Sequence, residues 1–272
     1  MGLALKQARW RKPEITGYVR RPEVGSYALS LGIVDKVESS LKKAVIDAEL
    51  VIIATPVLTI KDILTQIADN LAAGCVVTDT ASTKQRVLDW AKDLLPASVD
   101  FIGGHPMAGK EAFGIEAATA SLFQGCIYCL TPAPQAKQAA MQIVTDMVKA
   151  IGAAPLIIDA KEHDNLVAGI SHLPMLLSAA LVLTTTQNQA WDNKMSQLAS
   201  SGYRDVTRLA SGNPEMNAHI FVSNQDAVVY WIDEFIKELQ RLRGLIAIRD
   251  NEIERALASA REARQKWLEK RR

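Results

Sequence analysis

The chain has 272 residues, of which 49% are hydrophobic and 22% are charged, enough for two domains or one large domain with a substantial core. Its 31 basic and 30 acidic residues give a formal net charge of +1, which provides no electrostatic surface for nucleic acid. No apolar run is expected to be long enough to span a bilayer, and the apolar part of Met1 to Trp10 is too short for a signal peptide. We therefore expect a cytoplasmic protein with no nucleic acid and no membrane as partner.

Strand and helix patterns alternate through the first half of the chain, which predicts an α/β fold with a mostly parallel sheet and helices on both faces. The expected strands are Glu14 to Tyr18, Asp47 to Ala54, Cys75 to Thr78, Val99 to Ile102, Cys126 to Leu130 and Pro155 to Ile158. The expected helices run from Pro22 to about Gly32, from Pro56 to about Leu71, from Lys84 to Leu95 and from Pro134 to Ile151.

From Lys161 onward the pattern is helical and contains no convincing strand. We therefore place a domain boundary near Asp159, with an α/β domain over residues 1–159 and an all-helical domain over residues 160–272. The run LPMLLSAALVLTTT has hardly a polar face, which predicts a helix buried in a core or a subunit interface. The stretch from Gln225 to the end predicts one or two long helices, the last of them charged and either solvated or bracing a dimer.

The stretch from Phe101 to Glu111, FIGGHPMAGKE, combines flexible backbone, a titratable ring and charge. Gly103 and Gly104 predict a close approach of the backbone to a ligand just before His105. In an open α/β sheet, ligands bind outside the carboxyl ends of the strands, which is where this strand places the histidine. His105 is therefore the candidate catalytic residue, and the alternative is a turn histidine that only caps backbone groups.

The three cysteines do not suggest a disulfide framework in a chain of this length. Cys126 and Cys129 have CxxC spacing, but the surrounding GCIYCLTP is typical of a strand, where residues three apart point to opposite faces. We therefore expect neither a metal site nor a redox pair.

Four motifs considered together resemble the prephenate and arogenate dehydrogenase family. They are DTASTK at 79–84, HPMAGKE at 105–111, SHLPM at 171–175 and GYRDVTRLASGNPEM at 202–216. FIGGHPMAG and LASSGYRD are most similar to the cyanobacterial arogenate enzymes. The resemblance covers nearly the whole chain, and it implies a Rossmann domain followed by an all-helical dimerisation domain, and hence a homodimer.

The chemistry that the resemblance implies is an oxidative decarboxylation in tyrosine biosynthesis, in which hydride leaves the carbon bearing the ring hydroxyl, carbon dioxide leaves the opposite carbon and the ring becomes aromatic. His105 matches the histidine that accepts the hydroxyl proton. Ser82 matches a serine that contacts both the hydroxyl region and the nicotinamide, and it could also be the N-cap of the following helix. Glu111 matches an acidic residue that gates the site, with a surface glutamate as the alternative.

Substrate binding is expected from a second group of residues. Arg208 matches the arginine that holds the ring carboxylate, and Arg204 matches a position near the site entrance, although two arginines at this spacing could also form a solvated helix face. We expect His172 either to bind substrate or to be a structural histidine. His163, in the domain linker, is a weaker candidate for a role in the site. Some prephenate-specific relatives have a histidine where Met175 stands, so the sequence does not decide between arogenate and prephenate.

The cofactor preference is expected at the end of the second Rossmann strand, where an acidic residue binds the ribose of NAD. Val19 stands about there, and Arg20 and Arg21 follow, which suits the 2'-phosphate of NADP. We predict NADP, with NAD as the alternative cofactor. The alternative interpretation of Arg20 and Arg21 is a pair of exposed turn arginines with no role in cofactor binding. The further cofactor contacts expected from the resemblance are Thr55, Pro56, Asp79 and Ser82.

A Rossmann domain opens with a strand and a GxGxxG turn that holds the pyrophosphate, and this sequence begins MGLALKQARW without either. In the family, a segment similar to GLALK lies just after that turn. We expect either that the start lies upstream or that strong nucleotide binding has been lost. In both cases the neighbours of the central first strand should be left unpaired.

Two alternatives to this function stay open. A related hydroxyacid dehydrogenase would share the first domain but should lack SHLP and GYRDVTR. A non-catalytic dimerising homologue would keep the fold but bind nucleotide weakly.

Overall fold

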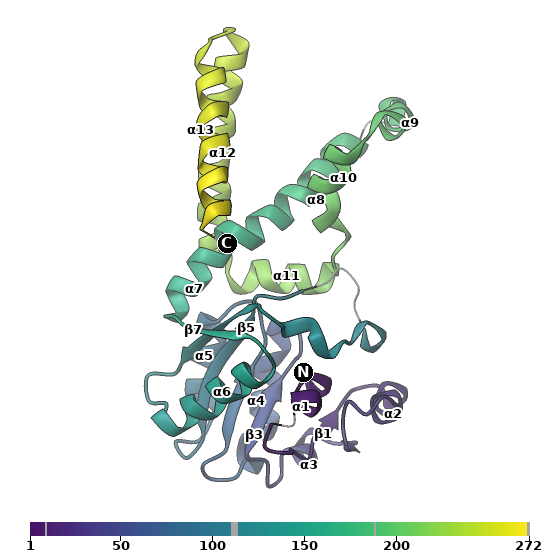
Figure 1. The fold of residues 1–272 in the computed structure, drawn as a ribbon, viewed down its shortest axis with the longest axis vertical. Helices are drawn as coiled ribbons and strands as arrows, with labels where there is room; N and C mark the ends of the chain where they lie inside the picture. The colour runs from purple at the N-terminus through teal and green to yellow at the C-terminus, as the bar shows by residue number, and fades with distance from the viewer. Residues whose placement is uncertain (9, 110–113, 188, 271–272) are drawn as a thin grey trace. The chain divides into compact units, whose positions relative to one another are not determined.

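The computed structural model describes residues 1–8, 10–109, 114–187 and 189–270. It contains two compact units, Met1–Gln225 and Asp226–Arg272 (Figure 1). The first unit therefore includes both the sheets and the helices that follow them up to residue 225. The domain boundary predicted near Asp159 stays a prediction.

The main sheet has five strands in the order β3-β4-β5-β6-β7. All neighbouring pairs are parallel except β5 and β6, which are antiparallel. The strands are β3 (Leu50–Ile53), β4 (Val76–Asp79), β5 (Asp100–Pro106), β6 (Ile127–Pro132) and β7 (Ala154–Ile157). The predicted α/β sheet is thus confirmed.

A second, two-stranded parallel sheet is formed by β1 (Thr16–Tyr18) and β2 (Lys36–Glu38). The sequence pattern did not predict β2, because its three residues are too few for a recognisable alternation. β1 and β3 belong to different sheets. The main sheet therefore has β3 as one edge within the described part of the chain.

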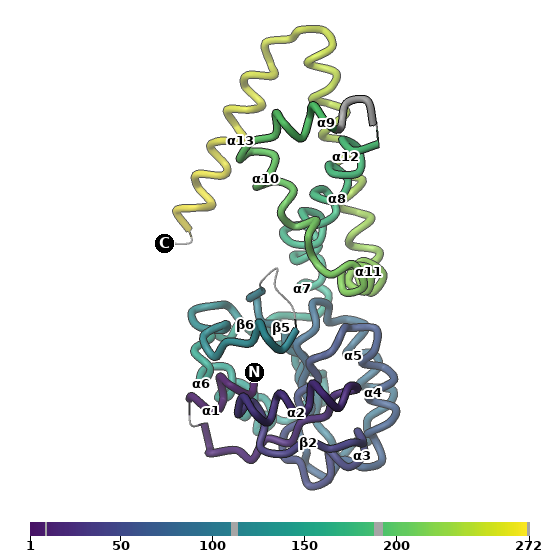
Figure 2. The backbone as a smooth tube through the Cα atoms, turned by 90° about the vertical axis from the view of Figure 1, so that its right-hand side faces the viewer, coloured from purple at the N-terminus to yellow at the C-terminus, as the bar shows by residue number. Residues whose placement is uncertain are grey.

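Alternate residues of the strands enter two separate cores, as the two-residue period of a strand requires. Val76 and Ile102 pack with α1 (Gly2–Ala8) and α6 (Gln138–Ala150) on one face. Val77 and Phe101 pack on the other face with α4 (Ile60–Ile67) and α5 (Gln85–Leu94). Figure 2 shows these helices on opposite sides of the sheet. The carboxyl ends of β4 and β5 are thereby fixed at one edge.

The remaining elements of this part of the chain are short. They are α2 (Pro22–Ser30), α3 (Leu41–Ala44) and the 3₁₀ turns η1 (Val57–Thr59), η2 (Ala68–Asn70), η3 (Ile115–Ala117) and η4 (Ala120–Phe123).

Helices follow from Asp159 onward, and no strand lies among the described residues there, as predicted. In the first unit they are α7 (Ala160–Val167), the π turn η5 (Ala168–His172), α8 (Leu173–Thr186), α9 (Gln189–Leu198), α10 (Ser201–Thr207), the 3₁₀ turn η6 (Arg208–Ser211) and α11 (Pro214–Ser223). Pro174 explains the π turn, because it lacks the N–H that would bond Ile170 and its ring would clash with that carbonyl.

Because the π turn keeps the helix continuous, residues Ala160–Thr186 form one segment of 27 residues with a mean hydropathy of 2.0 in its most apolar window. By length and composition this segment could cross a membrane, which corrects the expectation that no such run exists. Only 28% of that window is buried within the single chain, so the helix is not a core helix of one chain, and its burial in a subunit interface stays a prediction. Its first half nevertheless carries buried polar groups that bond to the sheet domain.

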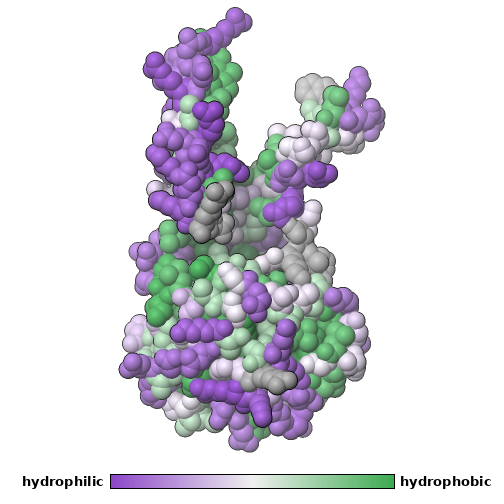
Figure 3. Space-filling view, viewed as in Figure 1, coloured by the Kyte–Doolittle hydropathy of each residue, from purple (hydrophilic) through white to green (hydrophobic). Residues whose placement is uncertain are grey.

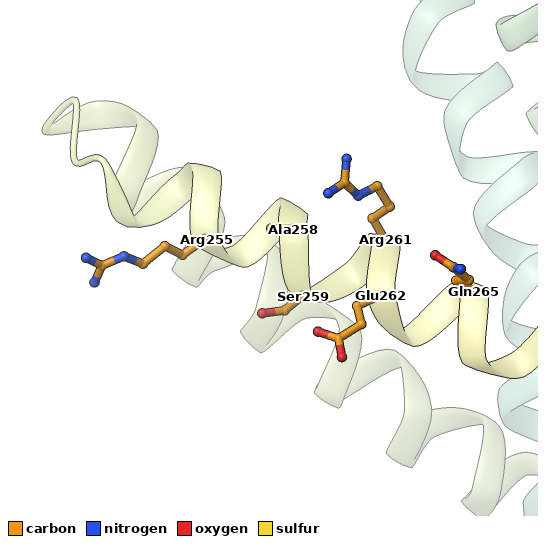
Figure 4. A pocket seen from close by; sticks show the side chains of 6 residues that line it. All are labelled: Arg255, Ala258, Ser259, Arg261, Glu262 and Gln265. Carbon is orange, nitrogen blue, oxygen red and sulfur yellow. The ribbon is translucent and has the colours of Figure 1, made fainter.

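The second unit consists of the long helix α12 (Gln225–Ala247), from Asp226 onward, and α13 (Glu252–Glu269). The face of α13 in Figure 3 is largely hydrophilic, which confirms the charged last helix. A shallow pocket on α13 is lined by Arg255, Ala258, Ser259, Arg261, Glu262 and Gln265. Figure 4 shows the side chains of Arg255, Arg261 and Glu262 pointing in different directions from the helix. They do not converge on a common point, so this pocket is not a candidate catalytic site.

Candidate active site

His105 lies near the carboxyl end of β5 and is buried, with 9% of its surface exposed. The two glycines before it pack closely against neighbouring strands, and their expected approach to a ligand stays a prediction. A Cβ on Gly104 would come within 2.4 Å of the Asp79 carbonyl oxygen, and a Cβ on Gly103 within 2.3 Å of Thr131 Oγ1. Only glycine lets β5 lie this close to its neighbours and bring His105 to the edge of the sheet.

A chain of two hydrogen bonds runs from His105 to a carboxylate on α7. His105 Nδ1 lies 2.9 Å from His163 Nε2, and His163 Nδ1 lies 2.8 Å from Asp164 Oδ1. All three side chains are buried. The helical segment that follows the sheet domain therefore completes the environment of the strand histidine.

The direction of these bonds fixes the proton positions. The Asp164 carboxylate already accepts the backbone N–H groups of Lys84 at 2.8 Å and Gln85 at 2.9 Å, so it also accepts from His163 Nδ1. With its proton on Nδ1, the His163 ring has a lone pair at Nε2, which accepts the N–H of His105 Nδ1. His105 is left with its own lone pair at Nε2. It is in the form of a proton acceptor.

Burial keeps His105 in that form. Desolvation lowers the pKa of His105 well below 6.5, and His163, Lys84 and His172 lower it further. A neutral imidazole at physiological pH is what a general base requires.

Asp164 also caps α5, which changes the interpretation of Ser82. The N-cap position of α5 is Lys84, and the N–H groups there are accepted by Asp164 rather than by a side chain of the 79–84 turn. Ser82 lies in the bend before the helix and is half-buried. The N-cap alternative for Ser82 is therefore wrong, and its contact with substrate and nicotinamide stays a prediction.

Asp79 and Lys84 form a second buried group beside the histidine. Lys84 Nζ donates to Asp79 Oδ2 and, at 2.7 Å, to the carbonyl oxygen of Gly104. Asp79 accepts the N–H of Gly104 at 3.0 Å and that of Ala81 at 2.9 Å. The predicted cofactor role of Asp79 stays a prediction. These contacts show that its carboxylate also stabilises the backbone around Ala81 and Gly104.

His172 ends the π turn and is 1% exposed. Its Nδ1 lies 3.3 Å from Asn224 Nδ2, and its Nε2 is buried without a hydrogen-bond partner among the described residues. Burial lowers the pKa of His172 to about 4. The side chain is therefore neutral near pH 7.

Arg204 and Arg208 are exposed on α10 and η6, which pack against α8. Ala210 N donates to Ser178 Oγ at 2.9 Å and ties η6 to that helix. In both views the label of α10 lies away from that of β5 (Figures 1 and 2). The substrate contacts of Arg204 and Arg208 stay predictions, and Glu111 lies outside the described residues.

The expected ribose end of the cofactor site lies at the carboxyl end of β1. Arg20 and Arg21 are exposed there, and a pocket is lined by Arg21, Glu23, Val24, Tyr27, Ile115 and Glu116. The guanidinium of Arg21 is suited to a phosphate at this pocket. Thr55 and Pro56 lie at the carboxyl end of β3, where Thr59 donates to Thr55 Oγ1 at 2.9 Å. The pocket beside Arg21 does not include Thr55 or Pro56, and the cofactor contacts of all four residues stay predictions. The sequence has no GxGxxG turn for the pyrophosphate of a nucleotide.

The sequence interpretation missed residues that the structure places at the centre. His163 was placed in a linker, yet it lies in α7 and bonds to His105. Asp164, Lys84 and Asn224 were not singled out. The adjacent pair His163-Asp164 at the start of a helix was an available signal, since a carboxylate beside a histidine often orients its ring.

A parallel α/β nucleotide-binding domain, a buried histidine poised as proton acceptor and a following helical domain define a protein of the dehydrogenase class. Residues 1–156 match the family model of the prephenate dehydrogenase nucleotide-binding domain, and residues 159–260 match that of the prephenate dehydrogenase dimerization domain. The chain belongs to the prephenate dehydrogenase family of enzymes.

Individual relatives agree with this assignment. The prephenate dehydrogenase of Bacillus subtilis is 34% identical over 253 residues, 93% of this chain and 68% of that protein. The prephenate dehydrogenase of Lactococcus lactis is 34% identical over 235 residues, and the match spans 85% of this chain and 64% of that protein.

Two solved structures are similar over almost the whole chain. Prephenate dehydrogenase from A. aeolicus, in complex with hydroxyphenyl propionate and NAD+, has a TM-score of 0.90 and 28% identity, covering 97% of this chain and 92% of that one. Synechocystis arogenate dehydrogenase has a TM-score of 0.82 and 30% identity, covering 98% of this chain and 95% of that one.

Proposed function

We propose that this protein catalyses the oxidative decarboxylation of arogenate, with prephenate as the alternative substrate, and that NADP accepts the hydride, in the biosynthesis of tyrosine. The observation that carries the proposal is the Asp164–His163–His105 chain, which presents a buried, neutral proton acceptor at the carboxyl end of β5. Family membership supplies the reaction class. The bound nucleotide would supply the hydride acceptor.

The contribution of the chain is to move one proton. His105 Nε2 takes the proton of the ring hydroxyl as the carbon beneath it loses hydride and becomes carbonyl-like. Asp164 holds His163, which spreads the positive charge that develops on His105. When carbon dioxide has left the opposite carbon, the electrons of the broken bond complete the aromatic ring, and His105 returns its proton to the phenolate oxygen. His105 is thus regenerated in each turnover.

Two observations support the details. The structural relatives include an arogenate dehydrogenase and a prephenate dehydrogenase that holds hydroxyphenyl propionate and NAD+. For NADP over NAD, the support is the exposed Arg20 and Arg21 at the end of β1, with no acidic residue at Val19.

We further propose a cytoplasmic homodimer. The chain has a family dimerization domain over residues 159–260. Its continuous helix leaves Ile170 70% exposed and Leu183 62% exposed, as expected for an apolar surface that a second copy covers. Size-exclusion chromatography with light scattering would give the mass of a dimer; a monomer at micromolar concentration would contradict this.

The function is tested by one assay of the purified chain with arogenate and prephenate, each with NADP and NAD, following nicotinamide absorbance. Turnover of arogenate with NADP above that of the other three combinations is the expected result. A simple hydroxyacid as the better substrate would favour the related hydroxyacid dehydrogenase. No turnover, together with no fluorescence change on nucleotide titration, would favour a non-catalytic homologue.

A further inference from the structure

Asn224 connects two parts of the candidate site. It lies between α11 and α12 and is 7% exposed. Its Nδ2 donates to the backbone oxygen of Asp164 at 2.7 Å and lies 3.3 Å from His172 Nδ1. One amide group thus contacts both the residue that anchors His163 and the second histidine.

The contact with Asp164 settles which amide atom faces His172. A backbone carbonyl oxygen only accepts hydrogen bonds, so the side-chain atom of Asn224 next to it must be the nitrogen. The same nitrogen has a second hydrogen, and His172 Nδ1 is in range to accept it. A neutral imidazole that accepts at Nδ1 carries its proton on Nε2.

His172 Nε2 is therefore a buried N–H donor, and no acceptor for it exists among the described residues. Buried donors without a partner are rare in folded proteins and call for an explanation such as a ligand. The second buried histidine of the candidate site, His105, has its Nδ1 at 2.9 Å from His163 Nε2. The two rings thus have opposite capacities, His105 with a lone pair at Nε2 and His172 with an N–H at Nε2.

We propose that Asn224 is a positioning residue that keeps His172 as an N–H donor for a substrate oxygen of the carboxylate or carbonyl class, while the Asp164–His163 pair keeps His105 as the acceptor. This inference deepens the proposed function, on which the identity of the substrate rests. Asn224 acts through His172 and needs no contact with substrate itself.

The charged groups around His172 are compatible with a neutral ring. Burial lowers its pKa to about 4, and the nearby Asp164 carboxylate opposes that shift without cancelling it. His172 then binds an oxygen by a hydrogen bond from a neutral ring, and the tautomer decides whether that bond exists.

The direct test reads the tautomer of His172 by ¹⁵N NMR in the full chain with labelled histidine. The chain has four histidines, so His172→Gln assigns the signal by its loss. The expected result for the wild type is a single neutral form with the proton on Nε2. A proton on Nδ1 in the wild type would overturn the inference without any further variant.

Asn224→Asp is the informative substitution, because a carboxylate can only accept. The proton of His172 should move to Nδ1, or both nitrogens should be protonated. Asn224→Leu offers no donor, and the single Nε2 form should be lost. Ser223→Ala is the matched control: Ser223 bonds to Thr83 and Ile220 but not to His172, and the tautomer should stay unchanged. An unchanged tautomer in both Asn224 variants would refute the positioning role.

Steady-state kinetics with arogenate and prephenate provide a second test of the positioning role of Asn224. The kcat/KM of Asn224→Asp should fall about 10- to 100-fold, mainly through KM, while Ser223→Ala stays near the wild type. A kcat/KM of Asn224→Asp equal to the wild-type value would overturn the inference. If the wild type turns over neither substrate, the proposed function fails, and the tautomer measurement still decides the role of Asn224.

Discussion

Lys84 and Asp79 form an ion pair in which both side chains are fully buried. The pair binds Gly104 on both sides, with Lys84 on its carbonyl oxygen and Asp79 on its N–H. Burial lowers the pKa of Lys84, and Asp79 opposes that shift as the nearest negative charge. Because Gly104 directly precedes His105, the pair fixes the backbone from which the candidate base projects.

Removing one partner of this pair should be costly. Lys84→Met leaves the Asp79 carboxylate buried without its cation, and we expect a loss of about 3 to 5 kcal/mol in the free energy of unfolding. Urea unfolding followed by circular dichroism measures it. Lys92→Met is the matched control, since Lys92 is exposed on the same helix and should matter little. Equal stability of the two variants would mean that the pair does not support β5.

His172 gives a pH dependence of stability. Its folded pKa, about 4, lies below the ordinary 6.5, so between these values the unfolded chain binds more protons than the folded one. The free energy of unfolding should therefore fall as the pH drops below about 6.5, by up to about 3 kcal/mol near pH 4. The urea midpoints of the wild type and of His172→Gln should differ at pH 7, and this difference should be smaller at pH 4.5. Parallel losses in both proteins would contradict the assignment.

Arg21 should set the cofactor preference if the ribose end is placed correctly. Arg21→Ala removes a charge-assisted bond to the 2'-phosphate, so the Kd for NADP should rise roughly tenfold while that for NAD is unchanged. Fluorescence titration with both nucleotides measures the two values. Arg11→Ala removes an exposed arginine that pairs with Asp146 and serves as control. An equal change for NAD and NADP would leave Arg21 as an ordinary exposed arginine.

Much of the fold could be predicted from the sequence because its signals are local. The runs around Val51, Val77 and Phe101 are apolar segments between turns, and each became a strand of the main sheet. β2 was missed because three residues give no period to recognise. The π turn before α8 follows from Pro174, but a proline alone does not tell a kink from a wider turn.

The candidate site was only partly predictable, for a physical reason. His105 was found because the glycines and the strand end lie next to it in the sequence. His163 and Asp164 lie on α7, whereas Asn224 lies between α11 and α12, and only tertiary packing brings Asp164 and Asn224 together across 60 positions of the chain. Lys84 was counted as part of a polar turn, and nothing in its neighbours indicates that its side chain is fully buried.

Arg208 is predicted to hold the ring carboxylate, and the described single chain leaves it exposed on η6. Arg208→Ala should mainly raise KM, and the loss reaches about 2 to 5 kcal/mol if the contact is desolvated in the complex. Michaelis constants for arogenate and prephenate test this, with the exposed Arg243→Ala as control. An unchanged KM would assign Arg208 to a solvated helix face.

The turnover of His105→Asn tests the central claim most directly, because every step of the account passes through the lone pair on His105 Nε2. The amide of asparagine can still accept a hydrogen bond but cannot take up the proton, so kcat should fall at least about 100-fold. Nucleotide affinity and circular dichroism should stay those of the wild type, since the glycines and the Lys84–Asp79 pair hold β5 without the imidazole. A folded His105→Asn protein that turns over its substrate at a rate near the wild-type value would contradict the account.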